Sequence, residues 1–180
     1  MTSAHRRPVA LALVIATGAI TVLATVDNGK ELFGPAIATM AGIYLMAYAI
    51  GRPSSAWLAF AVLSALVTAL HLLRVIDPGV AMTAVLVLLW LWALAARRRS
   101  GDAATLSLQT AGVVLFGALT LWCAAADLRP GLAIAGTGFL AHAAWDAYHY
   151  RADKVVSRSW SEFCAVVDLA VGVALLVLAT

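Results

Sequence analysis

Residues 79–96 read GVAMTAVLVLLWLWALAA, a run of eighteen residues without a charged side chain. As an α-helix rising 1.5 Å per residue, this run is about 27 Å long, close to the hydrocarbon thickness of a bilayer. Turn and charge signals close it on both sides, Asp77-Pro78 before it and Arg97-Arg98-Arg99 after it. These features predict a transmembrane helix.

The same pattern recurs six more times along the 180 residues. The other apolar runs lie at about 9–26, 33–51, 55–75, 104–126, 131–150 and 160–178. The segments between them are too short to hold another domain. The first run is longer than the apolar region of a signal peptide and no small-x-small cleavage site follows it, so we expect it to remain as a helix. We therefore predict an all-α fold, in which residues 1–180 form a single integral membrane domain, a polytopic membrane bundle of seven transmembrane helices.

The composition agrees with a membrane protein and excludes several other classes. Apolar residues make up 63% of the chain and charged residues 12%, whereas soluble domains have about half and a quarter. A net charge of +3, scattered along the chain, does not fit a nucleic-acid-binding protein. The two cysteines, Cys123 and Cys164, stand apart in apolar runs and form no zinc or disulfide motif.

The distribution of Lys and Arg predicts the orientation. If the N-terminus is cytoplasmic, seven spans place nine Lys and Arg residues inside and three outside, in agreement with the positive-inside rule. The inner nine are Arg6, Arg7, Arg52, Arg97, Arg98, Arg99, Arg151, Lys154 and Arg158, and the outer three are Lys30, Arg74 and Arg129. We expect a multi-pass protein of the cell membrane with its C-terminus outside.

An internal repeat relates the two halves of the chain. Residues 34–48 match residues 131–145 without gaps, and Trp57 and Phe60 match Trp160 and Phe163 at the same spacing. The repeat predicts a 3+1+3 arrangement, with one triplet at about 9–75, a linker helix at about 79–96 and a second triplet at about 104–178. One linker span makes the two triplets parallel rather than inverted.

This layout resembles that of the SWEET and PQ-loop transporters and of fused lycopene cyclases. The resemblance does not extend to motifs, because the Pro-Gln dipeptide of the PQ-loop transporters does not occur. The chain also lacks the retinal-binding lysine of a rhodopsin, since residues 160–178 contain no lysine. No family assignment follows from it.

The candidate site lies in the last two spans, where the repeat becomes asymmetric. His142, Asp146 and Asp168 correspond to Leu45, Ala49 and Ala65 of the first triplet. An ionisable group inside a membrane span costs about 2.5–3.5 kcal/mol on insertion scales, so such a group usually has a function or a partner.

Helical spacing predicts that these polar residues face one another. His142, Asp146 and His149 share one face of the run 131–150, and Ser161, Cys164 and Asp168 share one face of the run 160–178. His142 and Asp168 each lie roughly 12 Å from the cytoplasmic end of their helices, so they should meet. The full set of candidate binding residues also includes Gln109: His142, Asp146, His149, Cys164, Asp168 and Gln109.

Simpler interpretations remain for each member of this cluster. The pair of His142 and Asp168 is compatible with a hydrogen bond that only holds two helices together. Interfacial water is sufficient to explain Asp146 and His149. The spacing HxxxDxxH could present three metal ligands, but it matches no standard zinc signature. The sequence leaves open whether a metal or another cofactor binds.

Two functions of different kinds fit these observations. The first is a small permease or channel that moves a proton, a cation or a small solute through a site between the last two spans. The second is a membrane-embedded enzyme that uses Asp146, His142 and Asp168 for acid–base chemistry on a lipid or isoprenoid. The stretch His142-Ala143-Ala144-Trp145-Asp146 resembles the aromatic–acid stretch of fungal membrane terpene cyclases, in which acids start cyclisation.

A third interpretation is a binding or assembly subunit without turnover. The expected partners are the lipid bilayer and an ion, a small solute or a lipid substrate, without nucleic acid. The sequence leaves a homo-oligomer open.

Overall fold

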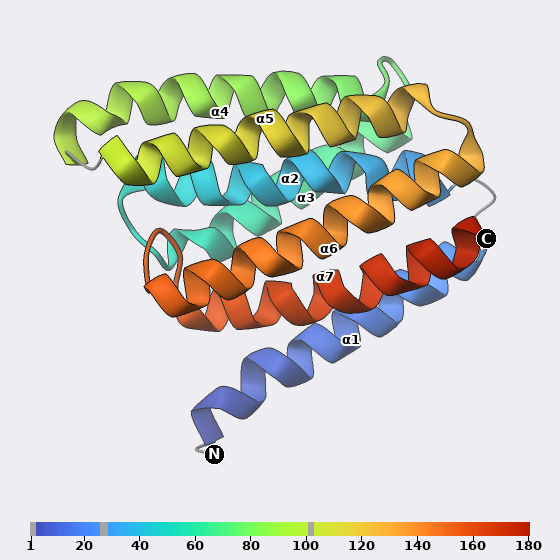
Figure 1. Ribbon diagram of the computed structural model, residues 1–180, viewed down its shortest axis with the longest axis horizontal. Coiled ribbons are helices and arrows are strands. Elements are labelled where there is room, and N and C mark those ends of the chain that lie inside the picture. The colour runs from blue at the N-terminus through green and yellow to red at the C-terminus, as the bar shows by residue number, and fades with distance from the viewer. Residues whose placement is uncertain (1–2, 26–28, 101–102) are drawn as a thin grey trace.

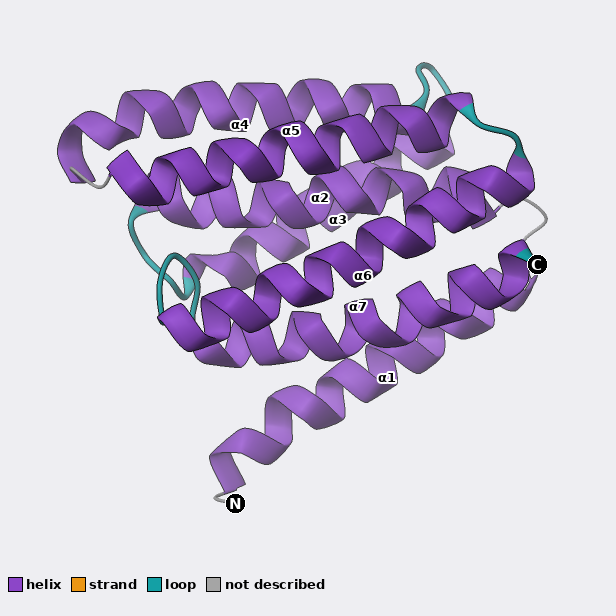
Figure 2. Cartoon of the chain, viewed as in Figure 1, coloured by secondary structure: helices purple, strands orange, loops and turns teal. Residues whose placement is uncertain are grey.

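A computed structural model describes residues 3–25, 29–100 and 103–180, and within them the chain forms seven α-helices and no strand (Figures 1 and 2). The helices are α1 (Ser3–Thr25), α2 (Gly29–Ile50), α3 (Ser55–Leu73), α4 (Pro78–Ser100), α5 (Ala103–Ala125), α6 (Leu128–Ala152) and α7 (Arg158–Ala179). The predicted seven-helix, all-α fold is confirmed.

The two ends of the bundle are named here by the terminus that each carries. The N-terminal end holds the start of α1 and the α2–α3 and α6–α7 joints. The C-terminal end holds the end of α7 and the α3–α4 and α5–α6 joints (Figure 1). Successive helices therefore run in opposite directions.

Six helices within the described residues are long and apolar enough to cross a bilayer: α1, α2, α3, α4, α5 and α7, with mean hydropathies of 1.5–2.3. Large apolar side chains such as Val14, Leu72 and Val114 point away from the bundle and are about 70% exposed. Water would not tolerate so much apolar surface, whereas lipid covers it at no cost. The chain is a multi-pass membrane protein.

The helix α6 is not among those six, although its 25 residues make it about 37 Å long. Its inward face carries His142, Asp146 and His149, and these polar groups lower its hydropathy. The prediction of a seventh span thus lacks the hydropathy that supports the other six.

The helix α2 lies at the centre of the bundle and packs against α3, α4, α5 and α6. Almost every residue from Phe33 to Tyr48 is buried. The helix α1 packs instead against α7, with Ala12, Ala16 and Leu23 buried (Figure 1). The helix α1, which the sequence repeat assigns to the first triplet, therefore lies against α7, the last helix of the second triplet.

The most extensive helix contact joins α6 and α7, and small residues make it close. A Cβ atom added to Gly136 would lie 2.9 Å from the Gly172 carbonyl oxygen and 2.8 Å from Leu176 Cγ. Glycines let membrane helices approach at backbone distance, where dispersion contacts stabilise the pair. This approach brings the polar faces of α6 and α7 together.

The α6–α7 joint is short and contains two residues with positive φ, Asp153 (51°) and Val155 (72°). A β-branched residue rarely adopts such a φ, so the surrounding packing must hold Val155 there. Ser157 then caps α7 by accepting a hydrogen bond from the Trp160 N–H, and the two helices leave the joint antiparallel.

Replacing Gly136 with alanine should destabilise the bundle. The added methyl group meets the Gly172 backbone as well as the Leu176 side chain, so overpacking should cost about 1–3 kcal/mol. Thermal unfolding in detergent measures the effect. Gly18→Ala on α1 is the matched control, since a Cβ there meets nothing within 4 Å. Equal melting temperatures for the two variants would contradict the role of Gly136.

Candidate functional site

The candidate site lies between α6 and α7, where the polar stripes of the two helices meet in the interior. The side chains of His142 and Asp146 have no exposed surface, and Asp168 is 2% exposed. Because the Asp146 side chain is fully buried, interfacial water does not explain its presence, an interpretation that the sequence left open.

His142 stands between the two carboxylates. Its Nδ1 atom lies 2.8 Å from Asp168 Oδ2 and 3.3 Å from Asp146 Oδ2. The Cys164 thiol, one turn before Asp168 on α7, donates to Asp168 Oδ2 over 3.7 Å. The prediction that His142 meets Asp168 at the same depth is confirmed, because the short joint keeps the two helices in register.

Tyr44 of α2 completes the cluster, and sequence analysis missed it. Its hydroxyl donates to Asp146 Oδ1 over 2.5 Å, and its ring lies 4.6 Å from that of His149. A tyrosine in an apolar run is usually interpreted as packing. The available signal was its depth, since Tyr44 lies far from the interface where tyrosines usually lie.

His149 forms a second polar contact nearer the N-terminal end. Its Nδ1–H donates to the Trp145 carbonyl oxygen over 3.0 Å. A carbonyl only accepts, so Nε2 is free to accept the amide N–H of Gln109 on α5, 3.1 Å away. Gln109 and His149, both predicted as site residues, are thus buried in contact with each other.

Several buried polar atoms of the site have no hydrogen-bond partner. They include His142 Nε2, Asp146 Oδ2 and Ser161 Oγ. An unpartnered buried polar atom costs about 1–3 kcal/mol, so it is usually retained for a reason other than stability. The hydrogen bonds within the cluster therefore leave some of its buried polar atoms without a partner.

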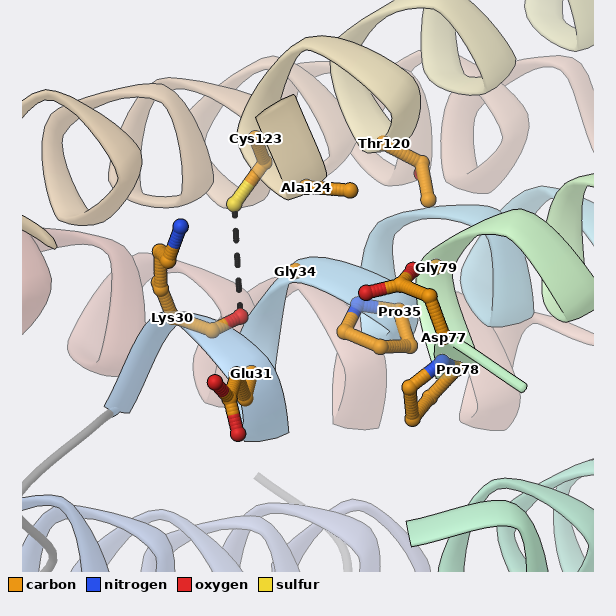
Figure 3. Close-up of a pocket in the computed structure, with 10 residues that line it drawn as sticks. All are labelled: Lys30, Glu31, Gly34, Pro35, Asp77, Pro78, Gly79, Thr120, Cys123 and Ala124. Atoms are coloured by element: carbon orange, nitrogen blue, oxygen red, sulfur yellow. Dashed lines mark hydrogen bonds between the residues drawn. The ribbon is translucent and has the colours of Figure 1, made fainter. Parts of the chain in front are cut away.

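Cavities open at both ends of the bundle. At the N-terminal end, His149, Thr105 and Lys154 line a cavity of about 160 Å³. At the C-terminal end, a cavity of about 50 Å³ is lined by side chains from α2, α4, α5 and the α3–α4 joint (Figure 3). Its polar members are Lys30, Glu31, Asp77, Thr120 and Cys123.

The C-terminal cavity is a polar site that sequence analysis did not identify. The Lys30 ammonium donates to the Ala126 carbonyl oxygen, and Asp77 Oδ1 accepts the N–H of Val80 at the start of α4. Cys123 Sγ donates to the Gly131 carbonyl oxygen over 3.3 Å. Three separate segments supply these groups, so no local motif predicts them.

Phe116 of α5 lies beside the α6–α7 cluster, between Thr105 and Thr120 along the helix, which line the N-terminal and C-terminal cavities. Its ring is fully buried and lies 5.1 Å from His142 and 5.8 Å from Trp145. Thr120, one turn further along α5, lines the C-terminal cavity. The buried face of α5 therefore carries Gln109 at one end, a phenyl ring in the middle and polar side chains at the other end.

The chain matches no known protein family, no curated protein and no solved structure.

Proposed function

We propose that the chain is a small permease that carries a cation through the α6–α7 cluster. The observation that carries this proposal is the enclosed group of two carboxylates and one imidazole, Asp146, Asp168 and His142, in the interior of a membrane bundle. Negative charge in a dry interior favours a cation as its partner.

The route across the bundle follows the buried face of α5. The cavity at the N-terminal end reaches His149, and the cavity at the C-terminal end reaches Thr120. Along α5, Phe116 lies between Thr105 and Thr120, which line the two cavities, and its ring is beside His142. A site that opens to one side at a time needs such a barrier, and an apolar ring is a common one.

In this proposal α6 crosses the membrane with the other six helices. Its polar residues face the bundle interior, as they do in membrane proteins that carry ions. The N-terminal end is cytoplasmic, because it carries nine of the twelve Lys and Arg residues of the chain. The 3+1+3 repeat then gives two parallel triplets, of which the second supplies the ionisable residues of the site and the first supplies Tyr44.

The burial of the cluster supports an ion over a lipid as the molecule that binds. His142 and Asp146 have no exposed surface on which an isoprenoid chain could lie. The alternative, a membrane-embedded enzyme with Asp146, His142 and Asp168 as its acid–base groups, requires a cavity beside them that is large enough for such a substrate. A lipid product formed by the purified protein would favour the enzyme.

Transport can be tested in proteoliposomes that contain an entrapped pH-sensitive dye or, separately, a zinc-sensitive dye. An imposed negative-inside potential should drive protons or Zn²⁺ into vesicles with the protein and not into empty vesicles. Wild-type protein that admits neither cation faster than empty vesicles would overturn the proposal.

In the same assay, Tyr44→Phe should slow cation entry by about ten- to a hundredfold, since a charge-assisted hydrogen bond of about 1.5–3 kcal/mol that orients Asp146 is lost. The ring contacts remain, so packing should be preserved. Tyr150→Phe is the matched control, because Tyr150 lies on the same helix as Asp146 and its ring contacts Arg158 rather than the cluster. Equal rates for the two variants would remove Tyr44 from the site.

A further inference from the structure

We infer that the α6–α7 cluster binds a transition-metal dication of the zinc class, with His142, Asp146, Cys164 and Asp168 as its four ligands. This inference rests on the proposed function for the role of the ion, since it names the class of cation that the site takes. Binding itself can be measured without transport.

The first support is the geometry of the donor atoms. One ligand atom from each of the four side chains lies within 4.8 Å of all the others. A tetrahedral ion with bonds of about 2.0–2.3 Å holds its donor atoms about 3.3–3.8 Å apart. The observed separations are 2.8 Å from His142 to Asp168, 3.3 Å from His142 to Asp146 and 3.7 Å from Cys164 to Asp168, so only the first must lengthen when an ion binds. The cluster already has nearly the size of a four-coordinate site.

The second support is the orphaned oxygen of Asp146. Asp146 Oδ2 is buried, lacks a hydrogen-bond partner and faces His142 Nδ1. The other oxygen of the same carboxylate accepts the Tyr44 hydroxyl, which fixes the carboxylate with Oδ2 directed into the cluster. Metal sites use such outer contacts to orient their ligands.

The third support is the chemistry of the donor set. One imidazole nitrogen, one sulfur and two carboxylate oxygens suit Zn²⁺ or Co²⁺, and the sulfur disfavours Mg²⁺ and Ca²⁺, which need six or more oxygens. A dication also neutralises the two carboxylates, which no Lys or Arg neutralises among the ion pairs of the described residues. On binding, the Cys164 thiol gives up its proton to water and coordinates as the thiolate.

Cobalt titration of the purified full-length chain in detergent tests this inference. One Co²⁺ per chain should bind with visible d–d bands of tetrahedral intensity and a near-ultraviolet sulfur-to-cobalt charge-transfer band. Zn²⁺ should displace it. Cys164→Ser should lose the charge-transfer band, and Asp168→Asn should weaken binding by about tenfold or more, because a buried charge partner of the ion is lost.

The matched control is Cys123→Ser. Cys123 is equally buried but lies in the C-terminal cavity, so this variant should bind cobalt with the wild-type spectrum. A charge-transfer band that disappears with Cys123 and persists without Cys164 would overturn the inference, as would a wild-type chain that binds no cobalt.

X-ray absorption of the zinc-loaded wild-type protein keeps the inference testable if Cys164→Ser does not fold. It should show one sulfur at about 2.3 Å and three nitrogen or oxygen atoms at about 2.0–2.2 Å. A shell without sulfur would exclude the proposed ligand set.

The two proposals fail separately. Proteoliposomes that admit protons, made from a chain that binds no cobalt, would keep the permease and remove the metal site. A chain that binds cobalt in detergent and admits no cation into vesicles would keep the metal site and remove the permease.

Discussion

Replacing Asp168 with asparagine should reduce cation entry into proteoliposomes by about tenfold or more. Removal of one partner from a buried charged pair costs about 3–5 kcal/mol, and a loss of 1.4 kcal/mol already corresponds to a factor of ten. Asparagine keeps the shape of the side chain and its ability to hydrogen-bond His142 Nδ1, which lies 2.8 Å from Asp168 Oδ2. The expected loss therefore arises from the missing negative charge rather than from a cavity.

Asp153→Asn makes the same chemical change at the surface. Asp153 is 58% exposed in the α6–α7 joint, where its Oδ1 lies 3.4 Å from Arg158 Nε. An exposed pair of this kind contributes little to stability, about 0–1 kcal/mol. Entry rates should match the wild type within about twofold. Asp168→Asn vesicles that transport at the wild-type rate would show that the cluster only holds α6 and α7 together.

Replacing Phe116 with alanine should make the bundle leaky. The phenyl ring is fully buried beside His142, one helical turn before Thr120 of the C-terminal cavity, and its removal leaves a void at that position. Cation entry should rise by about tenfold or more and lose its dependence on Asp168, since hydrated ions would pass the cluster without binding to it. Dye-loaded vesicles with Phe116→Ala and with the double variant Phe116→Ala/Asp168→Asn measure both effects.

Large-to-small changes in a core also cost about 3–5 kcal/mol of stability, so a matched cavity is needed elsewhere. Phe163→Ala supplies it, because Phe163 is 2% exposed in a cluster of aromatic rings with Trp57 and Trp160 at the N-terminal end. Phe163→Ala should lower the melting temperature without raising the rate of cation entry. Equal leakage from both variants would mean that Phe116 is an ordinary core residue.

Periodicity and length were sufficient to predict the helices, because each apolar run has the length of a membrane span. The facing of His142 and Asp168 was also predictable. Both lie ten residues from a short joint, and a fixed rise per residue places them at one depth.

Contacts between distant segments were not predictable in the same way. Tyr44 and Asp146 are 102 positions apart in the sequence, and the presence of a tyrosine at position 44 does not indicate which residue its hydroxyl will contact. The packing of α1 on α7 also has no local signature, because small and branched apolar residues fit equally well against many neighbours. Lys30, counted only as a surface charge, enters the C-terminal cavity through contacts with α5.

The packing of α1 against α7 has a consequence for biosynthesis. Translation delivers α1 to the bilayer before its partner α7, so α1 stays without this partner until about 150 further residues have been made. A nascent chain that stops before Arg158 lacks α7. In such a chain α1 has lost the helix against which it packs, and α7 does not cover the polar face of α6. The buried cluster of α6 can therefore form only after α7 has been made, because α7 supplies Asp168 and Cys164.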